Sequence, residues 1–337
     1  KSFLIGDNRI AAGDNKNIKI KKGQAIRIFT GAKMPINSST VIMQENINVF
    51  NNKIIVKKKP SKGQNTRLKG EDIKKNKKIL KKGTRIDTNY INLIAAIGFR
   101  KIKVLKKIKI GFFTSGDELR KPIKHLKGSE INNSNYYSLN SLLNLNLINS
   151  QYCGNLRDNF KYVEKKIKKT SARFDLIVTA GGASVGDEDH LIKVINKIGK
   201  IFFWKAAIKP GRPIAFGKVN KCFILCLPGN PVSVQLLYAL LVKPFIFYLS
   251  GSDILLPKAE KIKVNFKMQK KTNRMEWLRV IKKKKNFDFV AEKYNKQGSG
   301  MISSMAYADG IIEIPEEVKK IEYGQIYDYY DFKILFP

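Results

Sequence analysis

The chain has 337 residues, of which 43% are hydrophobic and 27% charged. This composition excludes a disordered chain, because enough apolar surface is available to offset the entropy lost on folding. The length exceeds a single ordinary domain of ~100–200 residues, so we expect two or three domains.

The formal net charge is +38, from 65 Lys and Arg against 27 Asp and Glu. The lysines are spread along the chain beside Ile and Asn, as in NIKIKKG and KKIKKTSARF, which indicates a bias in residue usage over an ordinary fold. We therefore expect no specific nucleic-acid partner. The expected consequence of the charge is a positive field that raises the encounter rate with small anions.

The cysteines and histidines predict neither a disulfide framework nor a zinc site. The three cysteines are Cys153, Cys222 and Cys226, and the two histidines are distant from them in sequence. An odd number of cysteines without framework spacing predicts reduced, mostly buried thiols in a cytoplasmic protein.

One apolar stretch, Val232 to Leu249, approaches the ~20 residues that cross a bilayer. Gln235, Lys243 and Pro244 interrupt it, so we predict a buried core helix and no membrane partner. The sequence opens at Lys1 without an initiator Met or an apolar leader segment, and we expect that an N-terminal portion has been omitted.

The first part of the chain, residues 1–76, alternates short β segments with turn signals and predicts a small β module. Residues 77–106 form a linking segment with one helix, for which Thr88 is the expected N-cap and Gly98 the stop. Residues 257–337 return to β segments, in KIKVNFKM, MEWLRVIKK, DFVAEKY and GIIEIPEE, and predict a C-terminal β-barrel module.

The middle, residues 107–252, alternates continuous apolar runs with helical stretches. IKIGFF, FDLIVTA, IFFWKAAI and KCFILCL are typical of strands covered on both faces. NSNYYSLNSLLNLNLI and DNFKYVEKKIKKTS are typical of helices. The alternation predicts a parallel sheet with right-handed crossovers in a three-layer α/β/α domain, flanked by the small β modules.

Ligands of such sheets bind beyond the carboxyl ends of the strands, so these ends are the predicted site. TAGGASVGDEDH follows one strand with three glycines, which permit close approach of an anionic ligand to backbone N–H groups. A structural turn with acidic helix capping is the equal alternative. TSGDEL follows another strand with two carboxylates, and AIKPGRP displays Lys209 and Arg212, where Arg can grip two oxygens of a phosphate. LPGNPVS leads into the apolar helix, with Asn230 or Ser233 as its expected cap.

Together these exits predict a site for an anionic ligand that also needs a divalent metal. In order along the chain, the strings TGAKMP, RLKGEDI, TSGDEL, NSNYYSL, TAGGASVGDEDH, AIKPGRPIAFG, LPGNPVS, RMEWLRV and QGSGMISSMAYADG resemble the molybdopterin molybdotransferases. This is the MoeA family, which is related to the E domain of gephyrin. The resemblance covers nearly the whole chain.

The resemblance implies insertion of molybdate into adenylylated molybdopterin, with Mg²⁺ assisting and AMP leaving. It also implies a homodimer, contact with the upstream adenylyltransferase, and Thr30 and Asp72 of the first β module at the site. The catalytic residues it implies are Glu118, Asp189, Asp72, Asp117 and Asp158, and the metal ligands are Glu118, Asp187 and Asp189. The alternative for Asp158 is that it only caps the next helix. The implied substrate-binding residues are Thr30, Thr114, Ser115, Gly116, Gly181, Gly182, Ser184, Gly186, Lys205, Lys209, Gly211, Arg212, Pro228, Gly229, Asn230 and Pro231.

The family also carries, before the first β module, a P-x-F-x-x-S-x-M-D-G-Y-A segment that this sequence does not contain. From that difference we expect ligand binding with weak catalysis. Two other interpretations stay open: an adenylyltransferase-like enzyme, which would lack the flanking β modules, and a non-catalytic scaffold, which would not need the carboxylates.

Overall fold

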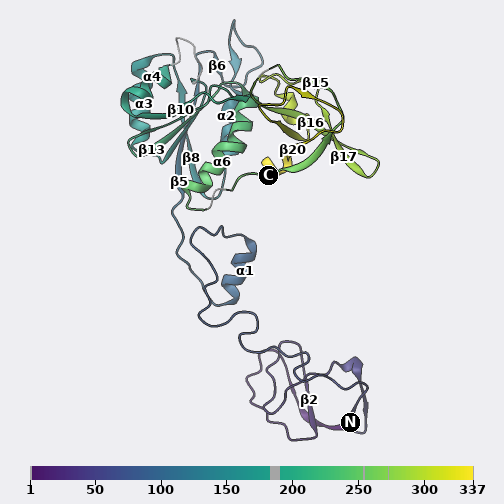
Figure 1. The fold of residues 1–337 in the computed structure, drawn as a ribbon. Helices are drawn as coiled ribbons and strands as arrows, with labels where there is room; N and C mark the ends of the chain where they lie inside the picture. Colours follow the sequence, from purple (N-terminus) through teal and green to yellow (C-terminus); the bar gives the residue numbers. More distant parts are fainter. Residues whose placement is uncertain (1, 183–189, 253–254, 272, 337) are drawn as a thin grey trace. The chain divides into compact units, whose positions relative to one another are not determined.

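The computed structural model describes residues 2–182, 190–252, 255–271 and 273–336. The chain forms two compact units, Lys1–Lys81 and Lys82–Pro337. Figure 1 shows the strands and helices of each unit. The second unit contains the α/β domain and the C-terminal barrel, and it carries most of the predicted site residues.

The first unit is built on one four-stranded sheet with the order β2-β1-β4-β3. Its strands are β1 (Ser2–Ile10), β2 (Gln24–Ile28), β3 (Ile47–Phe50) and β4 (Lys53–Val56), with a short 3₁₀ helix, η1 (Gln44–Asn46), before β3. Asn51 and Asn52 join β3 to β4 with positive φ at both residues, as the tight hairpin turn requires. Residues 57–81 contain no strand among those described and run as turns.

The linking segment contains the predicted helix, α1 (Thr88–Ala96). Thr88 is the first helical residue rather than the cap. Asp87 is the N-cap, because its carboxylate accepts hydrogen bonds from the backbone N–H groups of Asn89 and Tyr90. None of the α1 residues, all of which the structure describes, is buried.

The α/β domain is built on a six-stranded sheet with the order β10-β12-β13-β9-β5-β8. Four neighbouring strands run parallel: β5 (Ile108–Ser115), β8 (Ile148–Leu156), β9 (Leu176–Ala180) and β13 (Cys222–Leu227). The apolar runs predict β5, β9 and β13 of this parallel sheet, whereas no strand is predicted at β8. The other two, β10 (Lys200–Trp204) and β12 (Ala215–Val219), are antiparallel and form one edge. The expectation that IFFWKAAI is covered on both faces is therefore wrong. β10 is an edge strand with Phe202, Phe203 and Trp204 exposed.

Helices cover both faces of this sheet, which confirms the three-layer architecture (Figure 1). One face packs against α2 (Ser134–Leu142), α5 (Pro231–Leu237) and α6 (Lys243–Leu249). The other packs against α3 (Phe160–Ser171) and α4 (His190–Ile198). Two predicted helical stretches are shorter than expected. The first ends at Leu142, because the residues after it turn into β8, and the second begins at Phe160.

The long apolar stretch is a core element, as predicted. Pro231–Leu249 is long and apolar enough to cross a membrane, but 67% of its most apolar 18-residue stretch is buried inside the structure. A π-helical turn, η2 (Tyr238–Val242), joins α5 to α6 directly before Pro244. Such a turn accommodates a residue that has no N–H to donate to the helix ladder.

The C-terminal β segments form a closed barrel. Its strands are β14 (Glu260–Val264), β16 (Met275–Lys285), β17 (Asp288–Lys293), β18 (Gly310–Ile314) and β20 (Ile326–Asp331), and the pairing of β16 with β18 closes the ring. β11 (Ile208–Lys209) adds to β16 and attaches the AIKPGRP segment to the barrel. Short elements complete the unit: β6 (Leu119–Arg120), β7 (Ile131–Asn132), β15 (Met268–Gln269), β19 (Lys320–Ile321), α7 (Ser303–Tyr307) and α8 (Phe332–Leu335).

Candidate ligand site at the carboxyl ends of the strands

The predicted strand exits converge at one edge of the sheet. Thr114 of β5 and Leu227 of β13 both pair with Ala180 of β9, so the three parallel strands end at the same level. Backbone bonds continue beyond the strands, since Gly181 N donates to Leu227 O at 3.0 Å. Because the glycine and carboxylate motifs follow these ends, the fold brings TSGDEL, TAGG and LPGNP together.

Two glycines permit the tight spacing at this edge. Gly181 has φ +97°, and a Cβ on it would lie 2.7 Å from Ser115 O. Gly116 has φ +139°, and a Cβ on it would collide with the carboxylate of Glu118. Any other residue at either position would be strained or would displace its neighbour. Gly182 lies beside Ser115 and Leu191, where the next helix begins.

The exit of β5 is braced by a hydrogen-bond network centred on Thr114, which is fully buried. Thr114 Oγ1 donates to Asn155 Oδ1 at 3.0 Å and accepts from Asn133 Nδ2 at 3.0 Å. Its single hydrogen is used on Asn155, so Tyr152, whose hydroxyl is 2.9 Å away, is the donor of the remaining bond. Burial raises the pKa of Tyr152, which keeps this hydroxyl protonated. Asn155 Nδ2 in turn donates to Gly116 O at 2.7 Å.

The carboxylates of Asp117 and Glu118 follow directly, and both residues are exposed. Within the described part of the chain, neither side chain has a hydrogen-bond or ion-pair partner. The remaining carboxylates and small residues predicted for this site, Ser184, Gly186, Asp187 and Asp189, lie outside the described residues. Asp158 is exposed and does not cap α3, because Asn159 accepts the capping bond from Tyr162 N at 2.9 Å.

The predicted cations lie in the segment that joins the antiparallel strands β10 and β12, at the same edge of the sheet. Trp204 of β10 pairs with Ala215 of β12, which pairs with Cys226 near the end of β13. The intervening segment is held by backbone bonds from Lys205 N to Ile214 O and from Ala206 N to Arg212 O, each 2.9 Å long. Lys205 and Arg212 are exposed there.

Lys209 is tied to the barrel. Its ammonium group lies 3.4 Å from the carboxylate of Glu276, a side chain that is only 3% exposed. Gly211 packs against Leu237 of α5 and has φ +119°. The cation loop is therefore positioned from both the α/β domain and the barrel.

The LPGNPVS turn, with Pro228, Gly229, Asn230 and Pro231, leads into α5. Asn230 occupies the N-cap position, but its side chain makes no capping bond, and Ser233 lies inside the helix and is buried. Gly229 O instead accepts a bond from Asn135 Nδ2, and Val232 N donates to Ser299 O at 3.2 Å. The turn is thus fixed by α2 and by the QGSG loop of the barrel.

Sequence reasoning missed the residue that holds this loop. Arg279 is 1% exposed, and its guanidinium donates to Ser304 Oγ, Trp277 O and Gly298 O. No carboxylate pairs with it among the described residues, and burial lowers its pKa to about 10. The available signal was a cation among the apolar residues of the strand run MEWLRV, which also contains Glu276.

Thr30 and Asp72 belong to the first unit. Thr30 is exposed in a turn that Ala32 N closes by donating to Phe29 O, and Asp72 is exposed in a bend. Their contribution to the site remains a prediction.

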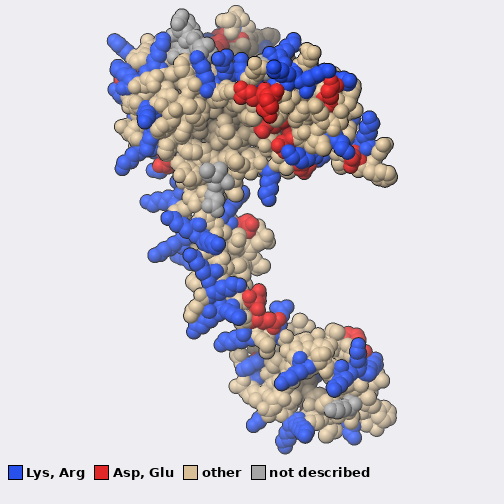
Figure 2. Space-filling model, viewed as in Figure 1, with Lys and Arg blue, Asp and Glu red and all other residues tan. Residues whose placement is uncertain are grey.

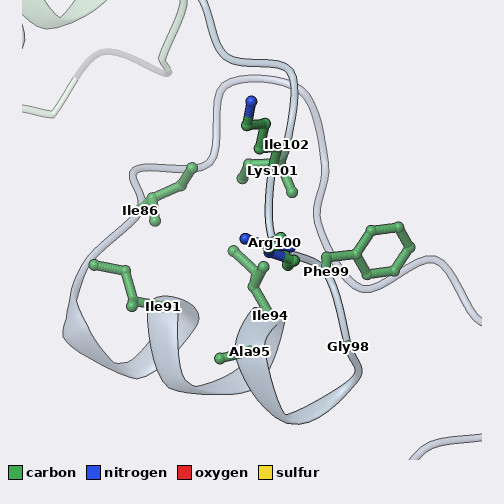
Figure 3. Close-up of a pocket in the computed structure, with 9 residues that line it drawn as sticks. All are labelled: Ile86, Ile91, Ile94, Ala95, Gly98, Phe99, Arg100, Lys101 and Ile102. Carbon is green, nitrogen blue, oxygen red and sulfur yellow. The ribbon is translucent and has the colours of Figure 1, made fainter.

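A separate hollow lies beside α1 (Figure 3). It has a volume of about 580 Å³ and is lined by apolar residues of α1 and of the segments that flank it, four of them isoleucines, together with Arg100 and Lys101. None of the predicted site residues lines it.

The fold and the edge together define an α/β ligand-binding protein with flanking β modules, whose site combines glycine turns, exposed carboxylates and cations. Three family models match the chain in this order: the MoeA N-terminal region (domains I and II) over residues 3–98, a probable molybdopterin binding domain over 111–248, and the MoeA C-terminal region (domain IV) over 261–332.

Relatives and solved structures agree. A putative molybdopterin biosynthesis protein of Methanocaldococcus jannaschii is 31% identical over 96% of this chain and 79% of that protein. The molybdopterin molybdenumtransferase of Haemophilus influenzae is 37% identical over 67% of this chain, which spans 56% of that relative. The molybdopterin biosynthesis MoeA protein of Pyrococcus horikoshii aligns over 98% of this chain and 81% of that chain, with a TM-score of 0.82 and 25% identity.

The chain belongs to the MoeA family of molybdenum cofactor biosynthesis. The predicted resemblance is confirmed. Both flanking models match, which favours this family over an adenylyltransferase-like enzyme.

Proposed function

We propose that this chain inserts molybdate into adenylylated molybdopterin and that AMP leaves as the metal-containing cofactor forms. Family membership supports the substrate class. The observation that carries the proposal is the convergence of the β5, β9 and β13 exits with Lys205 and Arg212 at one edge of the sheet. That edge offers both the oxygen ligands and the cations that a pyrophosphate-linked substrate requires.

The substrate is a polyanion, and the cations suit its binding. Lys205 and Arg212 are exposed at the edge, and Arg212 can contact two phosphate oxygens at once. Lys209 is held by Glu276, so its ammonium group is kept near the loop that joins the sheet to the barrel. We assign phosphate and molybdate binding to these three side chains and to the backbone N–H group of Gly182, because the N–H group of Gly181 already donates to Leu227 O.

Carboxylates of the β5 exit fit magnesium. Mg²⁺ prefers oxygen ligands and is usually held by one or two carboxylates together with substrate phosphates and water. Asp117 and Glu118 are exposed and without side-chain partners in the described part of the chain. The described residues hold no group of three His, Cys, Asp or Glu side chains that could bind a metal alone, so substrate oxygens would complete the coordination. When bound, Mg²⁺ would neutralise charge on the phosphates.

The finer assignments follow the same reasoning. We assign Asp187 and Asp189 to the metal, Asp158 to a supporting role, and Thr30 and Asp72 to completing the site in a homodimer. Contact with the upstream adenylyltransferase would deliver the substrate. The three free thiols fit a cytoplasmic protein.

The test is AMP release from adenylylated molybdopterin, measured with and without molybdate and Mg²⁺. The full chain is compared with Glu118→Ala and with Glu292→Ala, a matched control whose carboxylate pairs with Lys283 at 3.2 Å between β16 and β17 of the barrel. We expect molybdate-dependent release to fall about a hundredfold in Glu118→Ala, because the metal loses a carboxylate ligand, and to stay within about twofold in Glu292→Ala.

Equal activity of the Glu118→Ala variant and the unmodified chain would remove this carboxylate from the chemistry. Substrate binding without any AMP release by the unmodified chain would contradict the transferase activity itself.

A further inference from the structure

The side-chain amide of Asn135 makes a hydrogen bond through its nitrogen but none through its oxygen among the described residues. Asn135 is the second residue of α2 and is 6% exposed. Its Nδ2 donates to Gly229 O at 2.6 Å, but its Oδ1 is buried and has no hydrogen-bond partner among the described residues. In that part of the chain, no other buried side-chain oxygen or nitrogen lacks a partner.

This unused acceptor lies at the candidate site. The start of α2 is attached to the sheet edge at two points, by Asn133 Nδ2 on Thr114 Oγ1 at the β5 exit and by Asn135 Nδ2 on Gly229 O at the β13 exit. Both atoms of the Asn135 amide belong to one planar group, so Oδ1 also lies beside the LPGNP turn. By contrast, the side-chain oxygen of the neighbouring Asn133 is bonded, because its Oδ1 caps α2 by accepting a hydrogen bond from Tyr136 N.

An unpaired buried acceptor is costly. Leaving one without a donor costs about 1–3 kcal/mol, and native proteins seldom retain such groups without a reason. The bond to Gly229 explains the donor half of the amide but not the acceptor half. A donor supplied by a bound ligand would explain both.

The chemistry of the acceptor restricts the ligand. A carbonyl oxygen repels the oxygens of phosphate and molybdate, and it attracts N–H or O–H groups. In an adenylylated pterin these donors are found on the pterin ring and on the adenosine. The cations Lys205, Lys209 and Arg212 come from other segments of the chain and are available for the anionic part.

We propose that Asn135 Oδ1 accepts a hydrogen bond from an N–H or O–H group in the uncharged part of the substrate, and so helps to select a nucleotide-linked pterin over a simple anion. The proposal rests on the proposed function, because it takes its ligand from that reaction. Asn135 then binds substrate directly, and its bond to Gly229 turns Nδ2 toward the LPGNP turn, which leaves Oδ1 as the acceptor for the ligand.

The experiment compares the full chain with Asn135→Leu, which removes the acceptor while keeping the approximate size of the side chain. Tyr238→Phe is the matched control. The Tyr238 hydroxyl donates to Leu142 O, so this change also deletes one buried hydrogen bond to α2 but leaves the acceptor intact. Dissociation constants are measured by calorimetry for AMP, for 6-hydroxymethylpterin and for molybdate, which carries no hydrogen.

We expect Asn135→Leu to weaken either AMP or 6-hydroxymethylpterin about tenfold, the usual effect of one lost hydrogen bond. Molybdate affinity should stay within about twofold, and Tyr238→Phe should bind all three probes like the unmodified chain. Weakened AMP binding assigns the donor to the adenosine, and weakened pterin binding assigns it to the ring. Both results support the proposal.

Unchanged affinity for both organic probes would overturn the proposal and would indicate that a buried water, and not the substrate, donates to Oδ1. An equal loss of molybdate binding would also overturn it, because the variant would then have distorted the whole edge. Cooperative thermal unfolding checks that the variant folds, and Asn135→Ala replaces it if the larger side chain does not fit. If the unmodified chain binds neither organic probe, the proposed function fails together with this inference, whereas the other negative outcomes affect this inference alone.

Discussion

Single residues at the sheet edge act by holding loops in place. Arg279 gathers Gly298 O, Ser304 Oγ and Trp277 O around one buried guanidinium. A buried guanidinium that is not paired with a carboxylate costs free energy, and the hydrogen bonds that it donates to these three oxygens partly offset that cost. Ser299 O in the same loop accepts a hydrogen bond from Val232 N at the start of α5. By fixing this loop, Arg279 stabilises a contact between the barrel and the ligand site.

Cys222 gives a prediction for pH dependence. Burial raises the pKa of its thiol from 9 to about 12. Between pH 9 and 12 the unfolded chain therefore loses this proton while the folded chain keeps it. The resulting stability is complete below pH 9 and is lost as pH rises towards 12, by about 1.4 kcal/mol per pH unit.

The measurement is urea unfolding of the unmodified chain and of Cys222→Ala at pH 8, 9 and 10. We expect the difference in unfolding free energy between the two proteins to shrink above pH 9 in favour of the variant. A difference that stays constant with pH would show that the folded thiol titrates normally.

At the scale of elements, the N-terminal cap of a helix can also attach that helix to the ligand-site edge of the sheet. α2 and α3 both begin with an asparagine cap, Asn133 and Asn159, each accepting from the N–H of a tyrosine three residues on. Asn133 differs because its Nδ2 also donates to Thr114 at the β5 exit. The start of α2 is therefore coupled to the site, whereas the start of α3 is capped only locally.

The pair gives a matched prediction. Asn159→Ala should lower the unfolding free energy by about 1 kcal/mol, the usual cost of a lost cap. Asn133→Ala should lower it by about 2 kcal/mol, because the bond to Thr114 is lost as well. Urea unfolding of both variants decides the matter, and equal losses would mean that the bond to Thr114 adds nothing to stability.

At the scale of the whole molecule, charge dominates. Figure 2 shows Lys and Arg side chains scattered over the visible face of both units, with Asp and Glu in a few small groups. With a formal net charge of +38, the folded chain repels itself, and salt screens that repulsion over a length of about 10 Å at 0.1 M.

The melting temperature should therefore rise by several degrees between 0.02 and 0.5 M NaCl. Differential scanning calorimetry measures it, with equal osmolarity of sucrose as the uncharged control. A melting temperature that falls with NaCl would mean that favourable ion pairs, such as Lys282 with Glu260, outweigh the repulsion.

Much of the fold could be predicted because its signals are local. Continuous apolar runs marked β5, β9 and β13, and glycine-rich turns marked their exits. The antiparallel edge formed by β10 and β12 was not predicted, because an apolar run has the same appearance in an edge strand and in a central one. The sequence pattern predicts Thr88 as the cap of α1, but the cap is Asp87, because both residue types cap helices and only the backbone geometry decides which of two adjacent residues does so.

The sequence alone determined the three-layer domain with its flanking β modules, the family, and the edge at which the motifs meet, because periodicity and turn chemistry depend on residues near one another in the chain. Tertiary structure decided that Arg279 is buried and that Asn135 keeps an unused acceptor. Asn135 and Gly229 are 94 residues apart, and their contact exists only because α2 and the β13 exit pack at one edge of the sheet. Burial and hydrogen-bond pairing are properties of such packing, and no local pattern in the sequence encodes them.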